Sequence, residues 1–206
     1  RIMRFAAAIE RWDEAVPLGN GLMGGLLWGG GNTLKISLDR GDLWDLRMPQ
    51  AFQQPDWTWK TVQKLVREKK HEQIVAMSDQ PYSEDPYPTK IPAGRLELRL
   101  PGKRVLQSFT LDMLSACGRA EANGADAEVF FSAAEPVMLM RIAGCQPRLC
   151  LLPPPFAEQV NEQAGARPSL GRRSLGLLGY PPPAKGKRAN LQWFLQEGAC
   201  GFKYAV

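Results

Sequence analysis

The sequence predicts a mostly β protein, an antiparallel β-sandwich with one or two short helices. Short apolar runs recur between turns rich in Gly, Pro and Asn, and several of them alternate apolar with polar residues. Only residues 61–78 have apolar side chains at the spacing of a helix. The chain has 206 residues, 44% of them hydrophobic and 23% charged, so it contains enough apolar material for the core of one domain.

The clearest strand pattern lies in residues 12–45. A turn-rich start at residues 16–21 precedes two apolar runs, 22–28 and 34–38, which a Gly/Asn turn at residues 29–32 separates. Two short apolar runs joined by such a turn are typical of a β-hairpin. We therefore expect two adjacent antiparallel strands here.

The two strands of this hairpin are expected to differ in burial. Leu34, Ile36 and Leu38 share one face of the second strand, and the residues between them are polar, so only one face should lie in the core. The first strand is apolar on both faces, as a strand inside a sandwich would be. Residues 39–45 are expected to leave the sheet as a polar loop containing one Trp.

Residues 61–78 are expected to form two short helices, because the apolar positions shift in phase after a charged run at residues 67–70. His71, the one His of the chain, lies at that junction and is expected on the surface. The preceding loop, 48–59, contains two Trp residues that either cap the core or stack on a sugar. The Pro- and Tyr-rich segment 79–92 is not expected to form regular structure.

Further strands are expected on both sides of the helices. The alternation of Leu96, Leu98 and Leu100 with polar residues predicts one of them. Another is assigned to residues 1–11, which contain an apolar patch at residues 5–9. The others are assigned to the remaining apolar runs, which are residues 105–114, 115–122, 127–133, 136–142, 191–195 and 201–206. The last two are predicted to form a final hairpin after Pro/Gly-rich linkers. Because that pattern has no closing polar tail, we expect the domain to be incomplete at its C-terminus.

The net charge of +5 is concentrated in one segment. Residues 163–190 form a basic Pro/Gly-rich stretch without an acidic residue. We interpret it as a long exposed loop within the domain rather than a phosphate-binding patch, because no nucleic-acid motif accompanies it. No nucleic-acid partner is therefore expected.

Neither a metal ion nor another cofactor is expected. The four cysteines contain no C-x-x-C pair, and the chain has one His. Cys145 and Cys150 are close enough in sequence for a disulfide, with buried free thiols as the alternative. No run approaches the ~18 apolar residues of a membrane span, so no span is predicted.

A longer motif crosses the predicted hairpin. The order W-D-E-A-V-P-L-G-N-G, strand, Gly turn, strand, D-x-x-D-L-W in residues 12–45 resembles the amino-terminal domain of glycoside hydrolase family 95. Known members of that family are α-L-fucosidases and related α-L-galactosidases. The resemblance continues more weakly to about residue 142, through the P-x-G-x-L-x-L pattern of residues 92–98. The Asn-Glu pair of the family is replaced here by Asp39-Arg40, a departure that bears on the choice of substrate.

The resemblance implies a non-catalytic amino-terminal domain of a larger glycoside hydrolase, because the family's catalytic residues lie in a downstream helical (α/α)6 barrel. No catalytic residue is carried over to this chain. The domain would pack on that barrel, help to shape the mouth of its carbohydrate site, and be secreted or periplasmic. The residues expected at the mouth or the domain interface are Asn20, Asp39, Arg40, Asp42 and Trp44.

Two alternatives stay open from the sequence. The candidate residues could simply close turns, as Asn and Asp often do. The chain could also be a stand-alone carbohydrate-binding or scaffold β-sandwich. Catalysis by Asp39, Asp42 and Asp45 is the weaker hypothesis: glycoside hydrolysis needs two carboxyl groups, but Asp residues in such a loop are more typical of turns and caps.

Overall fold

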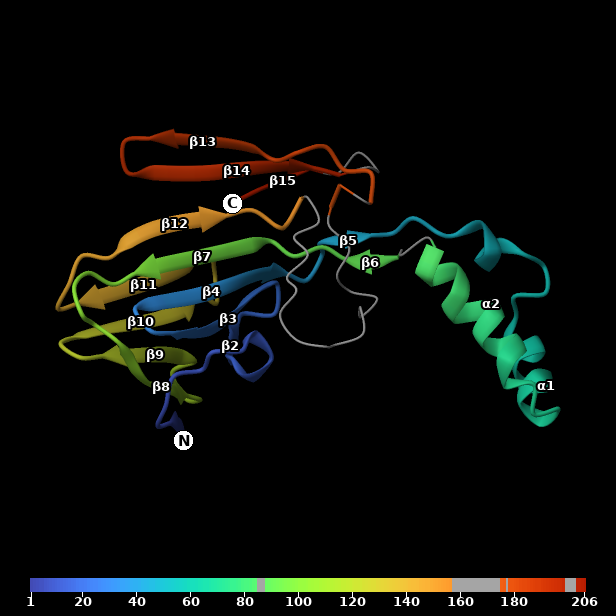
Figure 1. Ribbon diagram of the computed structural model, residues 1–206, viewed down its shortest axis with the longest axis horizontal. Coiled ribbons are helices and arrows are strands. Elements are labelled where there is room, and N and C mark those ends of the chain that lie inside the picture. Colours follow the sequence, from blue (N-terminus) through green and yellow to red (C-terminus); the bar gives the residue numbers. More distant parts are fainter. Residues whose placement is uncertain (85–87, 157–174, 177, 199–202) are drawn as a thin grey trace.

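The computed structural model describes residues 1–84, 88–156, 175–176, 178–198 and 203–206 (Figure 1). In these residues, two five-stranded antiparallel sheets pack face to face as a sandwich. A three-stranded sheet, a two-stranded ladder and a helical segment are attached to it. The predicted fold class is therefore confirmed.

Both large sheets are antiparallel throughout. In spatial order, the first consists of β1 (Ile2–Phe5), β8 (Leu106–Asp112), β9 (Cys117–Ala122), β10 (Ala125–Phe131) and β11 (Met138–Ala143). The second consists of β12 (Arg148–Leu152), β7 (Gly94–Arg99), β4 (Thr33–Arg40), β3 (Met23–Gly30) and β2 (Val16–Gly19). The predicted hairpin, β3–β4, thus lies inside the second sheet.

The main core lies between the two sheets. Leu27 of β3 and Ile36 of β4 are fully buried there, and so is Phe109 of β8 from the opposite sheet. The sheets approach closely at Gly118, where an added Cβ would lie 2.8 Å from a methyl group of Leu18. Each large apolar side chain buried in this way contributes roughly 1.5–3 kcal/mol.

Trp28 explains why β3 is buried on both faces. Its side chain lies on the opposite face of β3 from Leu27, yet it is only 7% exposed. Lys35 Nζ lies 4.4 Å from the centre of the indole ring, and the guanidinium of Arg95 lies 5.8 Å from it. The indole N–H donates to Ser37 Oγ at 3.0 Å. The polar face predicted for β4, with Lys35 and Ser37, therefore covers the ring of Trp28 in β3.

The helical segment projects from one end of the sandwich, beyond the two-stranded ladder (Figure 1). It contains the 3-10 turn η2 (Gln50–Gln53) and the helices α1 (Trp59–Arg67) and α2 (His71–Glu84). The Thr58 hydroxyl accepts the N–H of Thr61 at 3.2 Å and so caps α1. Two helices are confirmed. The prediction of irregular structure over residues 79–92 is wrong at both ends, because α2 continues through Pro81 and residues 89–90 form a strand.

Trp57 caps this helical segment rather than the main core. Its ring packs on Phe52 with 4.8 Å between the centroids, and its N–H donates to the carbonyl of Met77 at 3.2 Å. Trp59, in contrast, is 72% exposed at the start of α1. His71 is exposed, as predicted.

Several strands were not predicted because their local sequence is weak. Residues 16–19 form β2 rather than a turn, and the edge position tolerates Pro17. The loop predicted over residues 39–45 is confined to residues 41–43. Residues 39–40 end β4, and residues 44–45 form β5 (Trp44–Asp45), which pairs with β6 (Thr89–Lys90). The linker expected after residue 144 contains β12. A further 3-10 turn, η1 (Trp12–Glu14), precedes β2.

The third sheet consists of β13 (Ala184–Arg188), β14 (Leu191–Glu197) and β15 (Lys203–Ala205). β14 pairs antiparallel with β15, so the predicted final pairing is confirmed. The prediction of an exposed loop over residues 163–190 is wrong for residues 184–188, which form β13, while residues 163–174 and 177 lie outside the described residues.

The cysteines of the described residues are free thiols: Cys117, Cys145 and Cys150 form no disulfide. Cys200 lies outside the described residues. No helix in the part of the chain that the structure describes is both long and apolar enough to cross a bilayer.

We expect Gly29→Ala to destabilise the sandwich. The φ of Gly29 is +148°, and an added Cβ would overlap the carbonyl oxygen of Thr33 and approach Leu106 to 2.9 Å. Such a clash is expected to cost about 3 kcal/mol, which lowers the melting temperature of a chain of this size by roughly 6–12 °C. Gly41→Ala is the matched control, because an added Cβ there meets nothing closer than 3.5 Å. Equal melting temperatures for the two variants would contradict this account.

Candidate functional site

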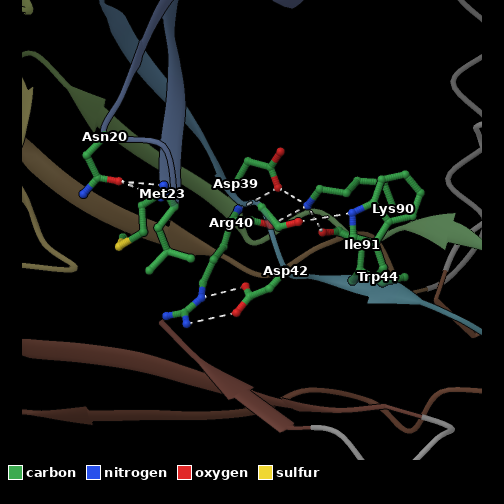
Figure 2. A network of polar contacts seen from close by, with 10 residues as sticks. Asn20, Met23, Asp39, Arg40, Asp42, Trp44, Lys90 and Ile91 are labelled. Carbon is green, nitrogen blue, oxygen red and sulfur yellow. Dashed lines mark hydrogen bonds and ion pairs between the residues drawn. The ribbon is translucent and has the colours of Figure 1, made fainter.

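The structure brings the five predicted candidate residues to one end of the second sheet (Figure 2). Asp39 and Arg40 end β4, Asp42 lies in the turn that follows, and Trp44 begins β5. Asn20 lies in the turn between β2 and β3, which is at the same end because β3 begins opposite the end of β4. We call these five residues the β4-end cluster.

Asn20 holds its own turn and connects the two sheets. Its side-chain Oδ1 accepts the N–H groups of Leu22 at 3.1 Å and Met23 at 2.8 Å. Its Nδ2 donates to the carbonyl of Ser132, just after β10 in the opposite sheet, at 2.6 Å. These contacts support the turn-closing role that the sequence left open for Asn20.

Lys90 of β6 belongs to the same place, although the sequence did not single it out. Its ammonium forms an ion pair with Asp39 and donates to the carbonyl of Arg40 at 2.6 Å. Asp39 also accepts the N–H of Arg40 at 2.7 Å. Lys90 therefore connects the two-stranded ladder to the end of β4. The Asp39 carboxylate already has partners within the domain.

Arg40 and Asp42 form a two-point ion pair. Nε of Arg40 donates to one carboxylate oxygen at 2.8 Å, and Nη2 donates to the other at 3.0 Å. The hydrogen bonds from Arg40 hold the pKa of Asp42 below its ordinary value, and its burial opposes them only in part. Because both side chains are exposed, the pair adds little to stability, and its main effect is to fix the shape of the turn.

Trp44 is 45% exposed, and its indole N–H already has a partner within the chain. It donates to the carbonyl of Gly41 at 3.2 Å, so the N–H does not need a partner from another domain. The exposed part of Trp44 is therefore the apolar surface of its ring.

The segment that begins at Trp44 presents every second side chain outward. Leu43 and Asp45 are buried, whereas Trp44, Leu46 and Met48 are exposed, Leu46 to 75% and Met48 to 51%. Outward side chains at the surface of an ordinary sheet are mostly polar. Three successive large apolar ones form an uncovered surface beside the β4-end cluster.

Asp45 is the buried carboxylate of this region and has a structural role. Arg47 donates to it with Nε at 3.0 Å and Nη2 at 2.6 Å, and the hydroxyl of Tyr180 donates at 2.6 Å. The same Arg47 donates to the carbonyl of Leu178 at 2.6 Å. This network ties β5 to residues 178–180, which lie in a second small core with Leu43 and its neighbours.

The hydrogen bonds decide the protonation of Asp45. Burial acts to raise the pKa of Asp45, but the hydrogen bonds from Arg47 and Tyr180 outweigh it, so the pKa lies below its ordinary value. A general acid in glycoside hydrolysis needs a raised pKa. Neither Asp45 nor Asp42 meets that requirement, so the geometry favours structural roles for both. Within the described residues, no three His, Cys, Asp or Glu side chains are grouped closely enough to hold a metal ion.

The fold and this site define an antiparallel β-sandwich domain with an uncovered apolar edge next to a polar cluster. A family model described as glycosyl hydrolase family 65, N-terminal domain, matches residues 3–196. The chain therefore belongs to this family of glycoside hydrolase N-terminal domains. The resemblance inferred from residues 12–45 is thus confirmed as a glycoside hydrolase N-terminal domain, but the matching description names family 65 rather than family 95. No curated protein matches the chain at a significant level.

We expect Trp44→Ala to leave the melting temperature nearly unchanged, within a few degrees. The indole is partly exposed, and its N–H contact lies on the surface. Phe109→Ala serves as the contrast, because Phe109 is fully buried and its truncation should cost about 3–5 kcal/mol, or roughly 6–20 °C. A loss for Trp44→Ala as large as that for Phe109→Ala would assign the indole to the core.

We expect Asp45→Asn to destabilise the chain by about 3 kcal/mol at pH 7, since it leaves Arg47 without its buried carboxylate. The pKa of folded Asp45 lies below the ordinary value of ~3.9, so the carboxylate stabilises the fold fully above that value. This stabilisation is lost as the pH falls through the lower folded pKa. The difference between wild type and variant should therefore shrink below about pH 4 in urea titrations. Asp42→Asn, at an exposed pair, should show little difference at either pH.

Proposed function

We propose that this chain is the non-catalytic amino-terminal domain of an α-L-fucosidase- or α-L-galactosidase-like glycoside hydrolase. In this proposal it packs on a downstream helical catalytic barrel of the same protein. The β4-end cluster and the apolar edge beside it lie at the contact, and they help to shape the mouth of the carbohydrate site.

The observation that carries the docking proposal is the outward row of Trp44, Leu46 and Met48. Large apolar side chains left in water in a row are costly, and Trp and Met are enriched in the cores of protein interfaces. Between the outward residues Trp44 and Leu46, the buried Asp45 accepts hydrogen bonds from Arg47 and Tyr180, which fix the backbone of the row at that point. Leu46 and Met48 themselves lie in the irregular segment between β5 and η2, next to this network.

The substrate class rests on the resemblance of residues 12–45 to family 95. Asp39, Arg40 and Asp42 present exposed donors and acceptors beside the apolar row. Hydroxyl-rich sugars are recognised by such groups, and an Arg held by two hydrogen bonds to Asp42 offers its remaining N–H groups in a fixed direction. These residues support a role at the mouth rather than in bond cleavage.

The test uses the full-length protein as its gene encodes it and the 206-residue chain alone. The full-length protein should hydrolyse aryl α-L-fucosides or α-L-galactosides, and the chain alone should not. Leu46→Asp should lower the activity of the full-length protein at least tenfold, because it buries a charge at the proposed contact. Leu114→Asp is the matched control, since Leu114 is 87% exposed in the turn between β8 and β9.

Each part of the proposal has its own contradicting result. Equal activities of the Leu46→Asp and Leu114→Asp proteins would remove the apolar edge from the interface. Turnover by the chain alone that disappears in Asp42→Asn would move the active site into this domain. Hydrolysis of other glycosides but not these two would discard the substrate class. A full-length protein without any further domain would favour a stand-alone binding domain.

A further inference from the structure

A cleft of about 460 Å³ lies between β12 and the β13–β14 hairpin. Sites for small molecules are commonly ~300–1,000 Å³ in volume, so the cleft is large enough for one. Its lining contains three basic residues and no acidic one, and the basic residues are Arg148, Lys185 and Lys187. Two of these belong to the basic segment of the sequence, and the third comes from a strand more than thirty residues away.

None of these three basic residues has an ion-pair partner among the described residues. Two basic residues on neighbouring strands are paired, in contrast: Arg95 with Glu97 at 2.9 Å, and Lys203 with Glu197 at 2.7 Å. The lining of the cleft therefore carries three positive charges that no acidic side chain of the lining balances.

The strand register places a fourth positive charge next to the cleft. Arg148 lies directly opposite Arg99 in the pairing of β12 with β7, and like charges in that position destabilise a sheet. A bound anion would relieve this repulsion, and a cleft lined by one sign of charge raises the local concentration of the opposite ion.

The hairpin residues that line the cleft lie on two faces: Lys185, Lys187 and Gln192 share one face, and Gly186 and Trp193 share the other. Trp193 is 40% exposed and lies opposite Gly186 in the β13–β14 pair. An added Cβ on Gly186 would overlap the indole, so the glycine allows the ring to lie against the backbone and holds it in one position. Gln192, which also lines the cleft, carries an amide that can donate to and accept from hydroxyl groups.

We propose that this cleft binds an acidic saccharide, with its carboxylate or sulfate held by Arg148, Lys185 and Lys187. Gln192, which shares a face of the hairpin with Lys185 and Lys187, contacts the neutral part of the sugar. The proposal uses the membership of the chain among glycoside hydrolase N-terminal domains, but it does not depend on the docking proposed above. The cleft is a separate site on different strands.

A saccharide fits the cleft better than a nucleic acid. Single-stranded nucleic acids are bound by several aromatic side chains on which successive bases stack. Here Trp193 is 40% exposed, but its neighbour Phe194 is only 1% exposed and its ring packs against Tyr204. Within the described lining, the ring on the face of the two lysines, Phe194, is buried, and Trp193 lies on the other face. Successive bases would therefore find no ring to stack on beside the cations, whereas a single charged sugar needs none.

The test measures binding of the full 206-residue chain by calorimetry to four probes. These are an oligogalacturonate, a sulfated dextran oligomer, neutral dextran and a single-stranded DNA of equal charge. We expect binding to at least one acidic saccharide, none to neutral dextran, and at least tenfold weaker binding to DNA. The first two probes distinguish a carboxylate ligand from a sulfate ligand.

The matched variants are Lys185→Gln/Lys187→Gln and Lys60→Gln/Lys103→Gln. Both remove two exposed lysines without an ion pair in the described structure, so they change the net charge equally. The first should weaken saccharide binding at least tenfold and the second less than twofold, with equal melting temperatures. Equal weakening by both variants, equal affinity for DNA, or no binding to either acidic saccharide would overturn the proposal.

Discussion

The pairing of β3 with β4 is the constraint on which the other parts of the structure depend. It runs from Met23 opposite Arg40 to Gly30 opposite Thr33. A shift by one residue would turn Leu34 and Ile36 out of the core, because side chains alternate between the faces of a strand. The shift would also move the end of β4 away from the ladder that Lys90 fastens to it. Since β7 pairs with β4 and β12 with β7, the same register positions the lining of the basic cleft.

Strands whose own residues show apolar alternation and turn motifs could be predicted from the sequence. Strands that form only by pairing with another part of the chain could not. The hairpin was predicted because apolar alternation and a Gly/Asn turn lie within one short stretch. β13 contains Lys185, Gly186 and Lys187, which have little strand preference, and it exists through its pairing with β14. β2 has a Pro between two inward residues and is stable only as the edge of a finished sheet.

The same difference applies to the candidate site. The sequence placed Asp39, Arg40 and Asp42 together because they are neighbours in the chain. Lys90 and Tyr180 were missed, since they reach their Asp partners across 51 and 135 residues. Burial then gives two nearby carboxylates different roles: Asp42 is exposed and shapes a turn, whereas Asp45 is inaccessible to solvent and needs three side-chain hydrogen bonds from Arg47 and one from Tyr180. Local sequence cannot distinguish these two outcomes.

Arg148, at one end of the cleft, lies at the opposite end of the second sheet from the β4-end cluster. Arg148 is opposite Arg99, which is opposite Thr33 at the start of β4, while the β4-end cluster lies at its other end. Seven residues of strand separate Thr33 from Arg40, a distance of roughly 20 Å. In Figure 1 the β13–β14 turn and the helical segment likewise lie at opposite ends of the molecule. A domain docked on the apolar edge would therefore leave the Arg148 end of the cleft uncovered, so the two proposals can be tested independently.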